Sequence, residues 1–103
     1  MRAEIANPSL RLPDIPGPGA SWHQIAGFAL TFDGYGHWGS FDKCAEIGNH
    51  GAQNFAKDQS LPRSLTELRT CLFFEQRRWH HFGDEPDDHT MGYIRALVGA
   101  IRA

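Results

Sequence analysis

Four segments of the 103-residue chain repeat apolar residues at helical spacing, and each begins beside a residue typical of helix starts. Ser21, Ser40 and Ser64 precede three of them, where a serine hydroxyl accepts a hydrogen bond from a backbone N–H of the first turn. Pro86, with acidic neighbours, precedes the fourth, and a first-turn proline with acidic flanks favours a helix start. No segment shows a convincing strand alternation. The pattern therefore predicts an all-α fold.

The four predicted helices differ in length and are joined by short connections. Each has a stripe of apolar residues that must be buried against another element. Helices of unequal length with short connections are expected to pack at steep angles. The sequence therefore predicts a compact four-helix orthogonal bundle. In chain order, the predicted helices cover 21–32, 41–57, 64–82 and 86–102.

The first twenty residues differ in composition from the rest. Four of the six prolines fall in them, and each proline lacks an N–H and restricts the residue before it, which excludes a helix. We therefore predict an extended arm over 1–20, followed by a single helical domain over 21–103. Leu10, Leu12 and Ile15 are the side chains by which the arm would reach the core.

The overall composition limits the classes of function. Ten Lys and Arg against twelve Asp and Glu give a net charge of -2, unlike the basic footprint of an electrostatic nucleic-acid binder. No apolar run approaches the ~20 residues of a membrane helix. The first residues also lack the apolar stretch of ~7 to 15 residues that a secretory signal needs, so we expect a cytoplasmic protein with Cys44 and Cys71 reduced.

Residues 34–39 read GYGHWG and match the glycine pattern G-x-G-x-x-G of dinucleotide-binding turns. That function requires a strand before the pattern and a second parallel strand after the next helix. The segment 25–32 has helical periodicity, and 57–62 reads as a turn. We therefore predict a glycine-rich connection between two helices and no bound cofactor.

The helix predicted over 64–82 has a carboxylate on its apolar face. Glu75 lies in the middle of that face, where an isolated charge is too costly to bury. A pKa-shifted acid is one interpretation, but no partner for acid and base chemistry is identifiable. We favour a buried polar residue that joins this helix to a neighbour or to the arm through an ion pair or hydrogen bond. The face comprises Leu65, Leu68, Cys71, Leu72, Glu75, Trp79 and Phe82.

The opposite side of the same helix combines aromatic and basic residues, namely Phe74, Arg77, Arg78 and His81, with Phe73 on a flank. One interpretation is a central helix packed on both sides, with both phenylalanines in the core. The other is a recognition surface, because arginine and aromatic residues are enriched at binding hot spots. The second interpretation predicts that Phe74, Arg78 and His81 face water, whereas the first predicts that Phe74 is buried.

From this surface we infer a small interaction or regulatory module that binds a protein partner or a second copy of the chain. One alternative is a nucleic-acid-binding accessory protein that uses the same surface. Another is a small enzyme that uses Glu75 with a buried histidine, and an enzyme is the less favoured class. A second copy could also approach along a stripe of small residues on the last helix: Gly92, Ala96, Gly99 and Ala103.

Histidines and acidic residues cluster near the end of the third predicted helix, but their spacing does not match a metal site. His80 and His81 are adjacent and so point about 100 degrees apart on a helix, and no H-x-x-x-H pattern occurs. Cys44 and His50 fall on opposite faces of the second predicted helix, which opposes a nucleophile pair. We therefore predict no metal and no catalytic set.

Small residues lie on the apolar face of the helix predicted over 41–57. Ala45, Gly48 and Ala52 share this face with Phe41 at its start. A face of small side chains allows another helix to come close. We therefore expect a neighbouring helix to pack tightly against it.

Overall fold

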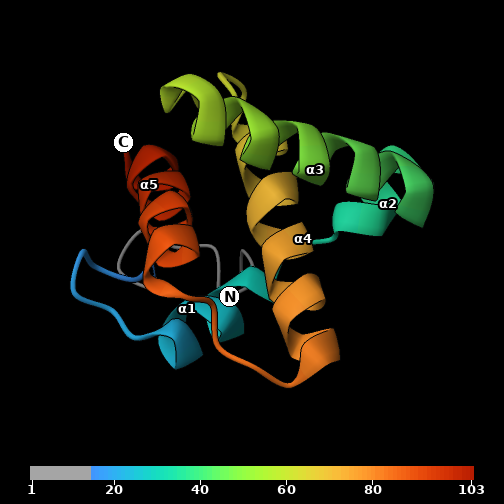
Figure 1. Ribbon diagram of the computed structural model, residues 1–103. Coiled ribbons are helices and arrows are strands. Elements are labelled where there is room, and N and C mark those ends of the chain that lie inside the picture. Colours follow the sequence, from blue (N-terminus) through green and yellow to red (C-terminus); the bar gives the residue numbers. More distant parts are fainter. Residues whose placement is uncertain (1–14) are drawn as a thin grey trace, which may run out of the picture.

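The computed structural model describes residues 15–103, except for the side chains of Tyr35, His37 and Phe82 (Figure 1). Four helices of eight to eighteen residues and one five-residue helix make up the fold, and the described residues form no strand. The predicted all-α bundle is therefore confirmed, with one additional short helix in the glycine-rich connection. The helices are α1 Trp22–Ala29, α2 Gly34–Trp38, α3 Phe41–Asp58, α4 Leu65–Phe82 and α5 Asp88–Arg102.

Local side-chain hydrogen bonds begin three of the helices where the sequence predicts them. The Ser21 hydroxyl accepts from the Gln24 N–H at 3.2 Å, and the Gln24 side chain accepts from the Ser21 N–H at 2.9 Å. The hydroxyls of Ser40 and Ser64 each accept from a first-turn N–H at 3.1 Å. Each bond satisfies a backbone donor that has no partner inside the helix, so these starts are determined locally.

The fourth long helix begins later than predicted. The Asp87 carboxylate accepts from the Thr90 N–H at 2.8 Å and caps α5, whose first residue is Asp88. Pro86 therefore lies before the cap and not in the first turn, and its ring is buried. Aspartate is among the best N-cap residues, so it determines the boundary in place of the proline.

Helix α4 is the centre of the bundle. Figure 1 shows α3 lying across the N-terminal half of α4, α5 beside α4 on the left and α1 at the bottom of the view. Helix α4 contacts each of the other four helices. Residues 70–76 are buried without interruption. Because successive residues of a helix point around its axis, two fully buried turns require neighbours on every side. The reading of α4 as a central helix is therefore confirmed.

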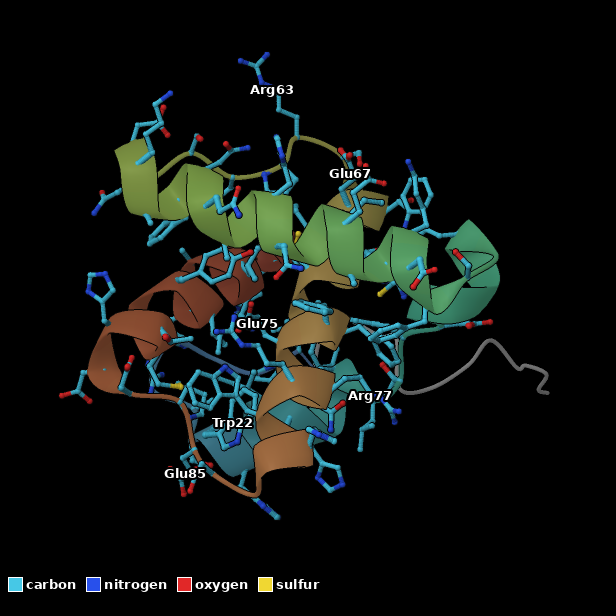
Figure 2. All side chains as sticks on the ribbon, turned by 45° about the vertical axis from the view of Figure 1, so that its right-hand side comes forward. Trp22, Arg63, Glu67, Glu75, Arg77 and Glu85 are labelled. Atoms are coloured by element: carbon cyan, nitrogen blue, oxygen red, sulfur yellow. The ribbon has the colours of Figure 1, made fainter. Side chains whose placement is uncertain are left out.

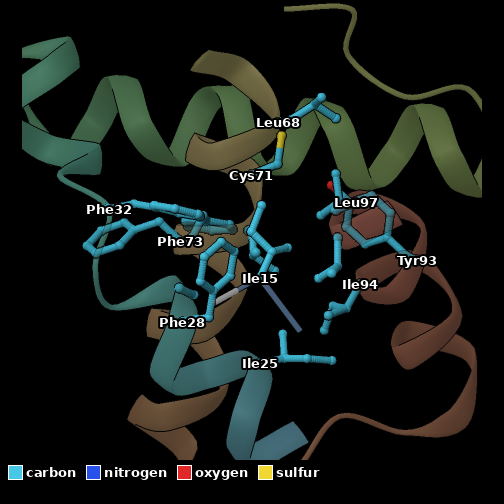
Figure 3. Packing of buried hydrophobic residues seen from close by; sticks show 14 of the residues in the cluster. Ile15, Ile25, Phe28, Phe32, Leu68, Cys71, Phe73, Tyr93, Ile94 and Leu97 are labelled. Atoms are coloured by element: carbon cyan, nitrogen blue, oxygen red, sulfur yellow. The ribbon is translucent and has the colours of Figure 1, made fainter. Parts of the chain in front are cut away.

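The buried side chains form one continuous cluster around α4 (Figure 3). Phe28, Phe32 and Phe73 gather at one end of it, while the residues contributed by α5 gather at the other. The rings of Phe28 and Phe32 meet edge to face with centroids 4.9 Å apart. The cluster draws residues from all four long helices.

Several side chains differ from the prediction in whether they are buried or exposed. Phe73 and Phe74 lie in the core, so the prediction that Phe74 faces water is wrong. Conversely, Leu65 and Phe41 are half exposed, although both were placed on apolar inner faces. Each is the first residue of its helix, where the neighbouring helices no longer cover the chain.

The end of the arm is attached to α5 by two arginines. Arg102 Nη1 donates to the Ile15 carbonyl and Arg95 Nη1 to the Pro18 carbonyl, each at 2.9 Å. Ile15 is buried in the core cluster, which confirms the predicted contact of this residue. Leu10 and Leu12, the other predicted contacts of the arm, lie outside the described residues. Arginine is well suited to such sites because its planar fork donates several hydrogen bonds at once.

Tight packing between α3 and α4 depends on two glycines. A methyl group at Gly48 would overlap the ring of Phe74, which confirms the predicted close approach at this residue. A methyl group at Gly51 would lie 2.7 Å from the Cys71 sulfur and 3.0 Å from the Tyr93 hydroxyl. The backbone of α3 therefore comes near α4 only because these two positions carry no side chain.

We expect Gly48→Ala to destabilise the protein by about 1–3 kcal/mol, because the added methyl overpacks the core against Phe74. Gly92→Ala is the matched control, since Gly92 lies in a helix and nothing approaches a methyl group there. The control should gain about 0.5–1 kcal/mol from the lower chain entropy of alanine. Denaturant titration gives both free energies of unfolding. Equal stability changes in the two variants would contradict the proposed close approach.

Candidate functional site

The C-terminal part of α4 extends beyond its neighbours and becomes exposed. Burial ends at Gln76, and from there the helix presents two arginines and two histidines to solvent. Figure 2 shows Arg77 on the side of the helix away from α5. We call Arg77, Arg78, His80 and His81 the α4 basic segment.

Glu75 lies directly before this segment and is completely buried, as predicted. Its Oε1 accepts a hydrogen bond from the Trp79 indole N–H at 3.0 Å, and Arg78 Nη1 lies 3.8 Å from its Oε2. The Arg78 guanidinium is in turn 5.5 Å from the centre of the Trp79 ring. Among residues 15–103 these partners are all on α4, so for the described part of the chain the expectation that Glu75 joins α4 to a neighbour or to the arm is wrong.

The surroundings of Glu75 favour its neutral form. Burial raises the pKa of its carboxyl above the ordinary value, although the hydrogen bond from Trp79 and the charge of Arg78 act in the opposite direction. The Glu75 Oε2 atom, the Gln76 Oε1 atom and the Tyr93 hydroxyl are buried and have no hydrogen-bond partner among the described residues. An ionised carboxylate here would be poorly solvated, because only one of its oxygens is hydrogen-bonded.

The two cysteines are free and buried. The Cys71 thiol donates to the Ile47 carbonyl at 3.6 Å, and burial raises its pKa to about 11. Burial likewise raises the pKa of Cys44, while His50 is exposed. Both thiols therefore remain protonated at neutral pH and lack the thiolate character of a nucleophile.

The structure divides the predicted partner-binding residues into two groups. Phe73 and Phe74 are core residues, whereas Arg77, Arg78 and His81 are exposed. His80 belongs to the same exposed segment. The predicted surface therefore keeps its basic residues and loses its aromatic ones, because α2 and α3 cover the aromatic positions.

The alternative of a small enzyme requires a histidine in the core beside Glu75, which is itself completely buried. Among residues 15–103, no group of three His, Cys, Asp or Glu side chains is arranged to hold a metal ion. The histidines with described side chains are all exposed: His23, His50, His80, His81 and His89.

Comparisons of the chain with protein-family models, with curated proteins and with solved structures find no match. Within the described part of the chain, no helix has the length and apolar character needed to cross a bilayer. The function must therefore be inferred from the described side chains themselves.

We expect Glu75→Gln to change how stability depends on pH. The folded pKa of Glu75 is raised, so the unfolded chain loses its proton first and folding becomes weaker as pH rises above the ordinary value of 4.5. Glutamine keeps an acceptor for Trp79 but cannot ionise. The free energy of unfolding of the variant minus that of the parent should therefore be larger at pH 7 than at pH 4. Denaturant titration of both proteins at both pH values measures this difference. A stability difference that is the same at both pH values would contradict the raised pKa.

Proposed function

We propose that the protein is a small interaction module that binds a protein partner of mixed surface charge, with acidic residues of the partner on the α4 basic segment. The observation that supports this proposal is the exposure of two arginines and two histidines within five residues, directly after two buried turns of the same helix. The buried turns hold the helix in place before any partner arrives. Less ordering is then required on binding, which favours affinity.

The side-chain chemistry of this segment suits carboxylates. An arginine guanidinium offers a planar fork of donors that matches a carboxylate with two parallel hydrogen bonds. Arg78 is only loosely engaged by Glu75, because its Nη1 lies 3.8 Å from the Glu75 Oε2 and its side chain is partly exposed. The guanidinium of Arg78 therefore keeps donors and charge for a partner.

The neighbouring charges favour a protein over a nucleic acid as the partner. Asp84, Glu85, Asp87 and Asp88 follow the basic segment and are exposed. Hydrogen bonds from Thr90 lower the pKa of Asp87, so this carboxylate stays ionised. A phosphate backbone would be repelled by these acidic residues, whereas a protein surface of mixed charge can match both signs. The net charge of -2 also disfavours binding to a nucleic acid.

A capture experiment with the full chain tests this function. We expect Arg77→Ala with Arg78→Ala to reduce the affinity for a captured protein about tenfold or more, because both charges are removed from the contact. Lys57→Ala with Arg63→Ala is the matched control, since it removes two exposed cations that lie outside the α4 basic segment. Figure 2 shows Arg63 far from Arg77, at the top of the view. The partner is recovered from nuclease-treated cell extract, identified by mass spectrometry and titrated by biolayer interferometry.

Circular dichroism and thermal melting confirm that both double variants are folded. A partner that binds the parent and the control equally, and releases with added salt, supports the proposal. Equal binding by the Arg77 and Arg78 variant would contradict it. Loss of all binding after nuclease treatment would instead indicate a nucleic-acid ligand.

A further inference from the structure

The glycine-rich segment lies beside an open cleft that the α4 basic segment does not share. The cleft has a volume of about 420 Å³ and lies between the start of α2 and the N-terminal half of α4. Gly34 and Gly36 line it, and Thr66 and Arg69 of α4 face them. Its volume falls in the range of about 300–1,000 Å³ that small-molecule sites occupy.

Arg69 brings a positive charge to the cleft in a fixed position. Its guanidinium lies over the Phe32 ring, 4.7 Å from the ring centroid. Phe32 is itself buried and packs beside Phe28 and Phe73 (Figure 3). Among residues 15–103, no carboxylate oxygen lies within 4.0 Å of the Arg69 nitrogens. The guanidinium is therefore positioned by an aromatic ring and keeps its N–H donors for a ligand.

Asp33 brings a negative charge to the same cleft. Its Oδ1 accepts a hydrogen bond from the Gly36 N–H at 2.6 Å, which holds the carboxylate at the start of α2. A methyl group at Gly36 would overlap this carboxylate, so the glycine is needed for the arrangement. The two charges of the cleft are thus held by their own neighbours, Phe32 for Arg69 and Gly36 for Asp33, and do not pair with each other.

We propose that this cleft binds a small zwitterion, an amino acid or dipeptide, with its carboxylate on Arg69 and its ammonium group on Asp33. A ligand with only negative charge, such as phosphate, would be attracted by Arg69 and repelled by Asp33. A simple cation would be attracted by Asp33 and repelled by Arg69. A zwitterion satisfies both groups at once. The Thr66 hydroxyl adds a further hydrogen-bonding group to the same wall.

Two tryptophans provide a reporter and an internal reference. The Trp38 indole N–H donates to the Thr70 hydroxyl at 2.7 Å, and Thr70 lines the cleft. The Trp79 indole N–H is bonded to Glu75 near the other end of α4. In ¹H–¹⁵N spectra of the full chain, a ligand in the cleft should therefore shift the Trp38 indole signal and leave that of Trp79 in place.

The probes are L-alanine, β-alanine and alanyl-alanine, whose opposite charges are increasingly far apart. N-acetylalanine lacks the ammonium group, alaninamide lacks the carboxylate, and inorganic phosphate tests for a simple anion site. We expect at least one zwitterion to shift Trp38, Gly34 and Gly36 saturably. The matching single-charge probes should bind at least about tenfold more weakly, because each loses one charge-assisted hydrogen bond.

Substitutions in the cleft give an independent measurement. Arg69→Ala and Asp33→Asn should each weaken zwitterion binding at least about tenfold. Asparagine keeps the acceptor for the Gly36 N–H, so the turn is preserved. Arg63→Ala is the matched control, an exposed arginine in the loop before α4, and should bind like the parent.

The proposal is overturned if no zwitterion shifts Trp38 saturably, or if N-acetylalanine or phosphate binds as tightly as the best zwitterion. It is also overturned if Arg69→Ala, shown to be folded by its spectrum, binds like the parent. None of the residues tested here belongs to the α4 basic segment, so either proposal can fail without the other.

Discussion

The packing of α4 against every other helix is the constraint on which the rest of the structure depends. Two consecutive turns, Thr70 to Gln76, have no exposed side, so α1, α2, α3 and α5 must be arranged around them. This arrangement accounts for the mixture of residues on α4, because a helix covered on all sides needs no polar face along those turns. Gly48 and Gly51 complete the constraint by letting α3 come close.

Burying a carboxyl group in such a helix normally costs free energy. The partners that reduce this cost for Glu75 belong to α4 itself. Trp79 is one turn further along the helix and donates to one carboxyl oxygen, while Arg78 approaches the other. Burial also raises the pKa of Glu75 above its ordinary value, because an ionised carboxylate would be poorly solvated there. The buried core is thereby joined directly to the first exposed arginines.

The same helix positions both candidate sites, at its two ends. Its N-terminal half supplies Arg69 to the cleft, and the Thr70 hydroxyl accepts the hydrogen bond of Trp38, which anchors α2 there. Its C-terminal end carries the α4 basic segment past the neighbouring helices. Because its central turns are buried, α4 is ordered before a ligand or partner binds at either end.

The sequence alone predicts the four long helices and the starts of three of them, because capping and periodicity act over three or four residues. Ser21, Ser40 and Ser64 cap helices as the sequence predicts, and Glu75 is buried as its position among apolar residues requires. The start of α5 was displaced because Asp87 caps it in place of the expected proline start. These are interactions between near neighbours in the chain, which a sequence displays directly.

Only the tertiary structure decided which side of α4 is covered. Phe74 and Arg78 are one turn apart on the same side, yet one is core and the other surface, because α3 reaches the first and not the second. The cleft is equally nonlocal, since Asp33 and Arg69 come from separate helical regions and meet only when α2 packs on α4. Helical periodicity gives the direction in which a side chain points from its helix. It does not give the length of the helix that a neighbouring helix covers, because that length depends on contacts between residues far apart in sequence.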